Sequence, residues 1–259
     1  MTGDISDWRM VVLISGSGIS AFLKNTADSS IPYETLLDEH WEADDSMLLG
    51  KIEGAVYDNP RILDDFSSEI IINAPKALWI PADFAEDDDD FAAQCYNRIY
   101  SASPEDIMTD DFRSLVNVYS LTPGLLPFLQ RTFPGARFSN HLTVLARKFV
   151  SRPSDVPAFY IDIARAEADI LLFDGSKLLC GAMHRWRHYA DIEYMVMNMI
   201  DVYDLNPDAV AVNISGLRET RIALLESLRD KVATVMNTML PAAAKEGLPL
   251  AAALSLSRI

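Results

Sequence analysis

Two histidines four residues apart, in His184-Arg-Trp-Arg-His188, have types and spacing that suggest metal chemistry. On a helix, that spacing would place both imidazoles on one face, as a zinc site requires. The segment instead follows an apolar, strand-like run and precedes Asp191, where we expect a helix to begin. In an extended chain the two imidazoles are too far apart for one ion. We therefore predict no metal site and interpret this aromatic and basic segment as lining a cleft or a partner surface.

An acidic run at residues 86–90 is the second candidate for a cation site. It immediately precedes residues 91–100, which have helical character, and the helix dipole stabilises carboxylates at a helix N-terminus. Calcium loops need spaced oxygen ligands and usually a turn-forming glycine, which this run lacks. His40 and His141 have no catalytic partners nearby, and no nucleophile-elbow, HExxH or Walker motif occurs. We therefore predict neither a metal site nor a catalytic residue.

Composition and charge limit the classes of function. The 259 residues are 49% hydrophobic, enough for a substantial core in one large domain or two small ones. Cys95 and Cys180 lie in no paired motif, and the N-terminus has no secretory signal, so we expect a reducing, cytoplasmic location. No segment is apolar enough to span a membrane. The formal charge of −16 disfavours direct binding of nucleic acid or anionic lipid, although Arg165, Arg185 and Arg187 leave room for a local basic patch.

The first half is predicted to begin with a β-hairpin. Residues 9–14 and 19–23 are apolar and rich in β-branched residues, and the segment between them provides turn chemistry. A helix with apolar residues at helical spacing is expected from residues 44–45 to the Asn59-Pro60 break. The remaining elements are expected to be strands at 69–73, 77–80 and 115–120 and helices at 91–100, 123–133 (opened by Pro123) and 140–149.

The second half is expected to repeat this order. Residues 151–157 contain two prolines among polar neighbours, so we place the boundary there, between halves at 1–151 and 152–259. An Asp174-Gly175 turn and a Met-rich helix that ends at Asn206-Pro207 are the main signals beyond it. The predicted strands are 158–163, 168–173, 177–182 and 209–214, and a last helix is predicted at 219–231. The two Asn-Pro breaks suggest a duplication, although Asn-Pro is also ordinary helix-stop chemistry.

Two segments of the second half carry a resemblance to a known family. They are Tyr160-Ile-Asp-Ile-Ala-Arg-Ala-Glu-Ala-Asp-Ile-Leu-Leu-Phe-Asp-Gly175, followed by Lys177-Leu-Leu, and Asn206-Pro-Asp-Ala-Val-Ala-Val-Asn-Ile-Ser-Gly216. The chain resembles an uncharacterised bacterial family, domain of unknown function 3822, over nearly its whole length. The resemblance implies an α/β protein with the actin-like ATPase fold, in which two ribonuclease-H-like halves each have a mixed sheet flanked by helices. It also implies a relation to cytoplasmic modules of pilus and secretion assemblies, but no established activity.

The same resemblance indicates where a nucleotide would bind. Actin-like ATPases hold phosphates with backbone N–H groups of two Asp-x-Gly hairpin turns, whose aspartates organise magnesium. The matching first turn is Ser15-Gly16-Ser17-Gly18, with Ser15 where the aspartate is expected. The second keeps Asp162 but has Ala164 in place of glycine, next to Arg165, and the adenosine loop keeps one glycine, in Ser215-Gly216. All three parts are degenerate, which disfavours hydrolysis because phosphoryl transfer depends on their positioning.

The preferred hypothesis is a non-catalytic adaptor or scaffold that acts through protein contacts and needs no cofactor. The alternative is a conformational switch that binds ATP and magnesium at the degenerate turns, and a sugar-kinase-like enzyme is least favoured. On the preferred hypothesis, Asp162 is a strand-end carboxylate bonded to backbone, and Arg165 pairs with Glu167. The Met-rich helix is interpreted as core, and exposure of Met197 with Tyr194 would favour binding. The sequence does not specify the partner, and self-association is left open.

Overall fold

The computed structural model describes residues 4–42, 47–86, 90–150, 155–240 and 248–257. The chain forms two compact units, one of residues 1–144 and 243–259 and one of residues 145–242. The division falls within helix α5 (His141–Phe149), shortly before the boundary predicted at residues 151 and 152. The C-terminal segment, which the sequence assigns to the second half, clusters with the first unit. No helix in the described ranges is both long and apolar enough to cross a membrane.

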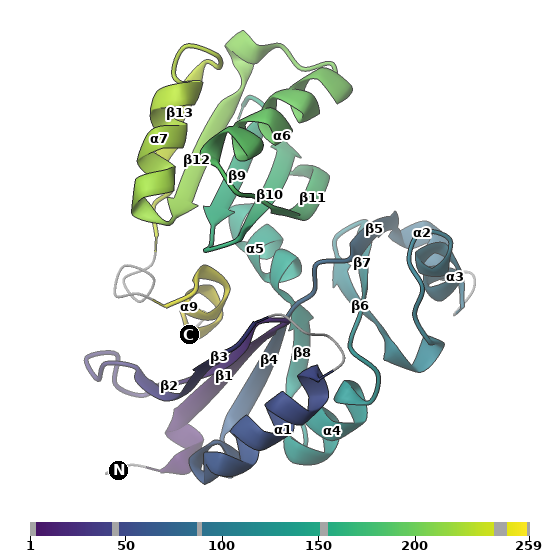
Figure 1. Ribbon diagram of the computed structural model, residues 1–259, viewed down its shortest axis with the longest axis vertical. Coiled ribbons are helices and arrows are strands. Elements are labelled where there is room, and N and C mark those ends of the chain that lie inside the picture. Colours follow the sequence, from purple (N-terminus) through teal and green to yellow (C-terminus); the bar gives the residue numbers. More distant parts are fainter. Residues whose placement is uncertain (1–3, 43–46, 87–89, 151–154, 241–247, 258–259) are drawn as a thin grey trace. The chain divides into compact units, whose positions relative to one another are not determined.

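A five-stranded mixed sheet forms the centre of the first unit, in the order β3-β2-β1-β4-β8 (Figure 1). Its strands are β1 (Trp8–Ser15), β2 (Gly18–Asn25), β3 (Glu34–His40), β4 (Ser67–Asn73) and β8 (Arg137–Asn140). The strands β1, β2 and β3 are antiparallel neighbours, whereas β4 and β8 extend the sheet in parallel from β1. The predicted hairpin is confirmed. The sequence missed β3, which is mostly polar and has one buried residue, and β8, which is four residues long.

Helices cover both faces of this first sheet (Figure 1). The helices α1 (Leu48–Asp58) and α4 (Leu125–Thr132) pack on the face that carries Met10 and Ile70. The short helix α9 (Leu250–Leu256) contacts β1 and β4, and Ser255 donates a hydrogen bond to Glu69. Because Glu69 and Ile70 are consecutive strand residues, they point to opposite faces, so α9 covers the face away from α1. Glu69 is buried and also pairs with Arg9.

A smaller antiparallel sheet, in the order β5-β7-β6, is inserted in the sequence between β4 and β8. Its elements are β5 (Ala77–Pro81), β6 (Ile107–Phe112), β7 (Leu115–Ser120), α2 (Ala82–Glu86) and α3 (Phe91–Asn97). Tyr96 and Val118 are fully buried in its own apolar core, and the Tyr96 hydroxyl lies 2.8 Å from the hydroxyl of Ser120. The sequence predicted β5, β7 and α3 but missed β6, which carries two aspartates.

The second unit contains another five-stranded sheet, in the order β11-β10-β9-β12-β13. Its strands are β9 (Ala158–Ile163), β10 (Glu167–Asp174), β11 (Lys177–Arg185), β12 (Ala211–Gly216) and β13 (Thr234–Asn237). The helices α6 (Tyr189–Val202) and α7 (Arg218–Leu228) share one apolar core with one face of this sheet (Figure 1). The predicted hairpin turn between β10 and β11 is confirmed, with Gly175 at a φ of 56°.

Apart from the smaller sheet inserted after β4 and the helix α9, both units have the same order of elements and the same strand pairing. In each, three antiparallel strands lead into a helix, and two later strands extend the sheet in parallel from the first strand of the unit. This agreement extends well beyond the two Asn-Pro breaks and supports a duplication. The predicted fold class is confirmed: the protein is α/β, with two mixed sheets flanked by helices.

Some predicted element starts differ from the structure. Pro123 does not open a helix, because Gly124 takes a φ of 80° and α4 begins at the next residue. Pro207 opens a short 3-10 helix (Pro207–Ala209), which delays the following strand, β12, to Ala211. Residues 44–45, most of the acidic run and residues 151–154 of the predicted linker lie outside the described residues.

Candidate functional site

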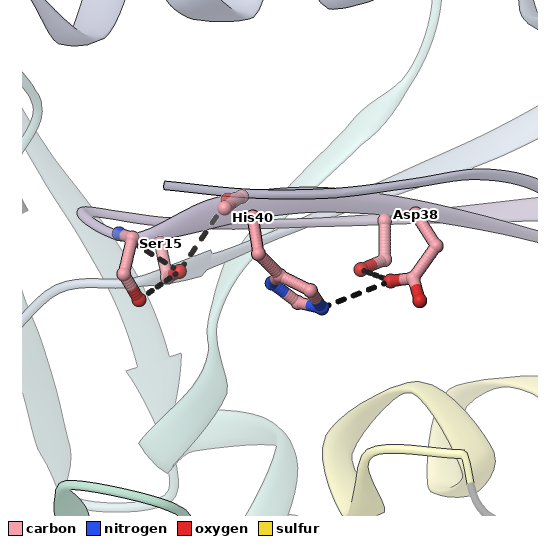
Figure 2. Close-up of polar contacts among 6 residues, drawn as sticks. Ser15, Asp38 and His40 are labelled. Carbon is pink, nitrogen blue, oxygen red and sulfur yellow. Dashed lines mark hydrogen bonds and ion pairs between the residues drawn. The ribbon is translucent and has the colours of Figure 1, made fainter. Parts of the chain in front are cut away.

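The first hairpin turn contains Ser15, Gly16, Ser17 and Gly18. The strand β1 ends at Ser15 and β2 begins at Gly18, and these two residues pair with each other. The Ser15 hydroxyl accepts a hydrogen bond from the backbone N–H of Ser17 at 3.3 Å and donates one to the carbonyl oxygen of Gly18 at 3.3 Å (Figure 2). One of the backbone donors that would face a phosphate is therefore already bonded inside the turn.

Trp41 closes this first turn from the end of β3. Its backbone N–H donates to the carbonyl oxygen of Ser17 at 3.0 Å, and its indole N–H donates to that of Gly16 at 3.1 Å. Both carbonyl groups at the tip of the turn thus have partners from the same residue. Because two separate bonds hold the tip, Trp41 fixes the conformation of the turn.

Trp186 closes the second turn in a similar way. The backbone N–H of Ala164 donates to the carbonyl oxygen of Glu167 at 2.8 Å, which leaves Arg165 and Ala166 at the exposed tip. The backbone N–H of Trp186 donates to the carbonyl oxygen of Ala166, and its indole N–H donates to the carbonyl oxygen of Ala164, each at 3.2 Å. Each unit therefore has a hairpin turn that is capped by the tryptophan directly following its third strand.

The strand register fixes which residues of the two turns correspond. Gly18 pairs with His40, the residue before Trp41, and Glu167 pairs with Arg185, the residue before Trp186. Counting back through both hairpins aligns Ser15 with Ala164. The sequence motif placed Ser15 at the aspartate position, whereas the strand register aligns Ser15 with Ala164. The residue that corresponds to Asp162 is Leu13, which is half-buried and apolar.

Asp162 and Ser215 lie opposite each other on the paired strands β9 and β12. The buried Ser215 hydroxyl lies 2.7 Å from the Asp162 carboxylate, to which it donates, and 3.1 Å from the carbonyl oxygen of Ile161. On its other side Asp162 pairs with Asp169 of β10. The structure thus brings two of the sequence-predicted site residues together, and the bond that joins them links neighbouring strands of one sheet.

At two positions of the candidate site, Gly216 and Gly18, the neighbouring strand leaves no room for a side chain. Gly216 has a φ of 91°, and a Cβ atom there would lie 2.1 Å from the carbonyl oxygen of Ile163. A Cβ atom on Gly18 would lie 2.7 Å from both the Glu39 carbonyl oxygen and His40 Nδ1. Close approach of neighbouring strands therefore explains both glycines without a bound phosphate.

His40 and Asp38 lie beside the first turn together with two serines, Ser15 and Ser20, a grouping that the sequence did not reveal. Figure 2 shows the His40 ring between Ser15 and Asp38, and His40 Nε2 lies 3.3 Å from the Asp38 carboxylate. The Ser20 hydroxyl donates to that same carboxylate at 2.7 Å. In a hydrolytic triad the imidazole joins the hydroxyl to the carboxylate, but here the carboxylate joins Ser20 to an imidazole that is 72% exposed. This arrangement does not activate a nucleophile.

The segment from His184 to His188 positions a turn and starts a helix. His184 lies in β11, where burial lowers its pKa and the carboxylate of Asp169 acts in the opposite direction. His188 caps α6 by accepting a hydrogen bond from the Ala190 N–H. Asp191 accepts bonds from the N–H groups of Arg187 and His188, which lowers the pKa of its carboxyl. Trp186, between the histidines, is the turn cap. The sequence did not predict these caps, because it missed β3, the strand that brings Trp41 to its turn.

Comparison with known structures identifies the fold. A Bacteroides thetaiotaomicron protein, described as having an actin-like ATPase fold and unknown function, is 14% identical, with a TM-score of 0.81 over 98% of this chain and 97% of its own. Ethanolamine utilization protein EutJ from Carboxydothermus hydrogenoformans is 10% identical, with a TM-score of 0.49 over 95% and 89% of the two chains. A PilM-PilN type IV pilus biogenesis complex is 12% identical, with a TM-score of 0.46 over 88% and 87%.

The first of these likenesses shows that the chain has the actin-like ATPase fold, as the resemblance implied. No curated protein matches the chain. A family model matches residues 4–233, which include both hairpin turns and both capping tryptophans. The chain therefore belongs to the family described as "Protein of unknown function (DUF3822)".

Proposed function

We propose that this protein is a non-catalytic adaptor or scaffold that works through contacts with other proteins. The observation that carries the proposal is that the chain's own side chains already bond both hairpin turns. Trp41 and Trp186 hold the turn carbonyl groups, and Ser15 takes the N–H of Ser17. In an actin-like ATPase, backbone N–H groups of the corresponding turns have to be free to donate to phosphate, whereas here the N–H of Ser17 donates to Ser15 and that of Ala164 donates to the carbonyl oxygen of Glu167.

The residue types at these turns also argue against a bound magnesium nucleotide. Magnesium sites use carboxylates to hold the ion and its waters, and the first unit offers Leu13 at the position of Asp162. Ser15 and Ala164 each add a Cβ atom at the position where glycine is expected. The proposed adaptor therefore needs neither ATP nor magnesium. Its two free cysteines suit a reducing compartment, which supports a cytoplasmic location.

The alternative proposal is an ATP-binding conformational switch with little or no hydrolysis. The observation in its favour is that the second unit keeps Asp162 and presents Arg165 at the exposed tip of the adjoining turn. A carboxylate and a guanidinium are groups that would serve magnesium and phosphate respectively.

A thermal-shift titration separates these two proposals. The purified protein is titrated with Mg-ATP and with Mg-ADP, and a ligand at a hundred times its dissociation constant stabilises a fold by about 2.7 kcal/mol. Asp162→Ala tests the retained carboxylate, and Asp174→Ala at the end of β10 is the matched control in the same unit.

The adaptor proposal expects no shift in any variant at millimolar nucleotide. A saturable shift that Asp162→Ala abolishes and Asp174→Ala retains would overturn the adaptor proposal in favour of the switch. Release of inorganic phosphate that is lost in Asp162→Ala would further indicate turnover.

A further inference from the structure

The outer face of α6 carries large apolar side chains that the unit does not bury. Tyr194 is 64% exposed and Val202 is 69% exposed, whereas Ile192, Val196 and Met199 of the same helix are in the core. Tyr194 and Val202 are eight residues apart, which places them on one side of the helix about 12 Å from each other. The intervening turn contributes Asn198, which is also exposed. Met195 and Met197, by contrast, pack against the core.

Tyr203, directly after α6, adds a partly exposed aromatic ring next to Val202 in the chain and is held in place. Its hydroxyl donates a hydrogen bond to the carbonyl oxygen of Leu179 at 2.8 Å, while the side chain stays 37% exposed. An aromatic ring that is already fixed loses little entropy when a partner covers it.

The C-terminal end of α6 concentrates negative charge beside these apolar side chains. Asp201 lies in the last turn, which has no basic residue, and Asp204 and Asp208 follow it. Among the described residues none of these three aspartates forms an ion pair. A helix C-terminus is itself a negative pole, so carboxylates there are locally unfavourable.

Asp204 makes this arrangement more unusual. It has a φ of 51° and ends the helix, a position where glycine or asparagine is the usual residue. The backbone N–H of Asp204 donates to the carbonyl oxygen of Asp201, and the backbone N–H of Leu205 donates to the carbonyl oxygen of Ile200. The chain thus has a carboxylate at a position where a neutral residue would suit the backbone better. Within the described part of the unit, no basic side chain pairs with these carboxylates.

We propose that this α6 surface, formed by Tyr194, Val202, Tyr203, Asp201 and Asp204, docks a cationic amphipathic segment of another protein. Lysine or arginine side chains of the partner supply the cations that the end of α6 lacks, and its apolar side chains cover the exposed anchors. The negative charge of the surface excludes phosphate-rich partners such as nucleic acids and anionic lipids. This inference rests on the proposed adaptor function and specifies the chemistry of its partner.

Fluorescence anisotropy tests the surface with a defined probe. The probe is a fluorescein-labelled amphipathic helix of leucine and lysine, used at physiological ionic strength, and the same helix with glutamate in place of lysine is the negative probe. One variant carries Tyr194→Ala with Val202→Ala, and a second carries Asp201→Asn with Asp204→Asn. Asparagine tolerates the backbone conformation of Asp204, so the second variant retains the fold.

Two controls match these changes elsewhere on the same unit. Ile222→Ala with Met236→Ala removes two other exposed apolar side chains, and Asp174→Asn with Asp230→Asn removes the same charge. The inference expects each surface variant to weaken lysine-probe binding at least tenfold, about 1.4 kcal/mol. Each control is expected to stay within about twofold, which is less than 0.5 kcal/mol.

Equal loss in the charge control would show that only the net charge of the protein attracts the probe, and that result overturns the inference. Absence of binding to the unmodified protein, or equal binding of the glutamate probe, overturns it as well. The nucleotide titration described above involves none of these residues. The nucleotide titration can therefore overturn the adaptor proposal, and the anisotropy measurement can overturn the docking surface, independently of each other.

Discussion

The indole N–H of Trp186 donates to the carbonyl oxygen of Ala164 at 3.2 Å, which closes the hairpin turn between β9 and β10. Trp41 forms the equivalent bond to Gly16 at 3.1 Å between β1 and β2. Neither tryptophan is near its turn in the sequence, and both reach it by following the third strand of their unit. The caps are thus a repeated feature of the duplicated fold.

Replacing Trp186 with phenylalanine is expected to loosen the second turn only. The substitution keeps an aromatic ring and removes one hydrogen-bond donor, which costs about 1 kcal/mol of stability. Hydrogen exchange at residues 164–167 should accelerate, while the turn at residues 15–18 should be unchanged. Trp41→Phe provides the reciprocal control. Equal acceleration of both turns by either variant would contradict a local capping role.

Adding a methyl group at Gly216 is expected to be severely destabilising. The Cβ atom would overlap the backbone of Ile163, and the φ of 91° is unfavourable for alanine. The expected loss is at least about 3 kcal/mol by urea unfolding. Gly54→Ala is the contrasting variant, because Gly54 is inside α1 with open space around its Cβ position. That change should stabilise the protein by about 1 kcal/mol, and stabilisation by Gly216→Ala would contradict the packing described for β9 and β12.

The buried carboxylate of Glu69 is expected to hold α9 on the first sheet. Glu69→Ala leaves the Arg9 guanidinium without its ion-pair partner and removes the hydrogen-bond acceptor of Ser255. The free energy of unfolding is expected to fall by about 3 kcal/mol in chemical denaturation. Ser255→Ala removes the hydrogen bond to Glu69 and a long one from Arg9, and it should cost about 1 kcal/mol. Ser257→Ala is the matched control, because its hydroxyl bonds only within the helix.

Proteolysis provides a second measurement of this contact. Glu69→Ala should increase cleavage near the C-terminus relative to the unmodified protein and the Ser257→Ala control. Unchanged cleavage together with unchanged stability would show that α9 is held by its apolar residues alone.

Asp191 is expected to make the stability of α6 depend on pH in the acidic range. Backbone hydrogen bonds from Arg187 and His188 lower its pKa below the ordinary value of 3.8. A carboxyl whose folded pKa is lowered stabilises the folded state above 3.8, and this contribution is lost as the pH falls through the folded pKa.

The test compares Asp191→Asn with Asp230→Asn by urea unfolding between neutral pH and pH about 3. Asp191→Asn should be less stable than the unmodified protein at neutral pH, and the difference should shrink below pH 3.8. A difference that stays constant with pH would mean that the charge of Asp191 does not contribute through its capping bonds.

The sequence by itself determined the elements that local chemistry dictates. Apolar β-branched runs predicted β1, β2, β4 and β9, and the Asp174-Gly175 turn predicted the β10–β11 hairpin. The helices and strands it missed were β3, β6, β8, β13, α2 and α9, because they are short, polar or apolar on all sides. The helix α9 has no amphipathic pattern to detect, since all seven of its residues are buried.

Only the tertiary structure decided what the candidate site residues do. The sequence motif placed Ser15 at the aspartate position, whereas strand register, which depends on pairing between distant segments, aligns Leu13 with Asp162. The same pairing explains Gly18 and Gly216 as points of close strand approach. It also brings the Trp41 and Trp186 indoles to turn residues that lie 25 and 22 positions earlier in the chain. Such contacts depend on packing between segments that are far apart in the sequence, and local propensity and residue spacing carry no information about it.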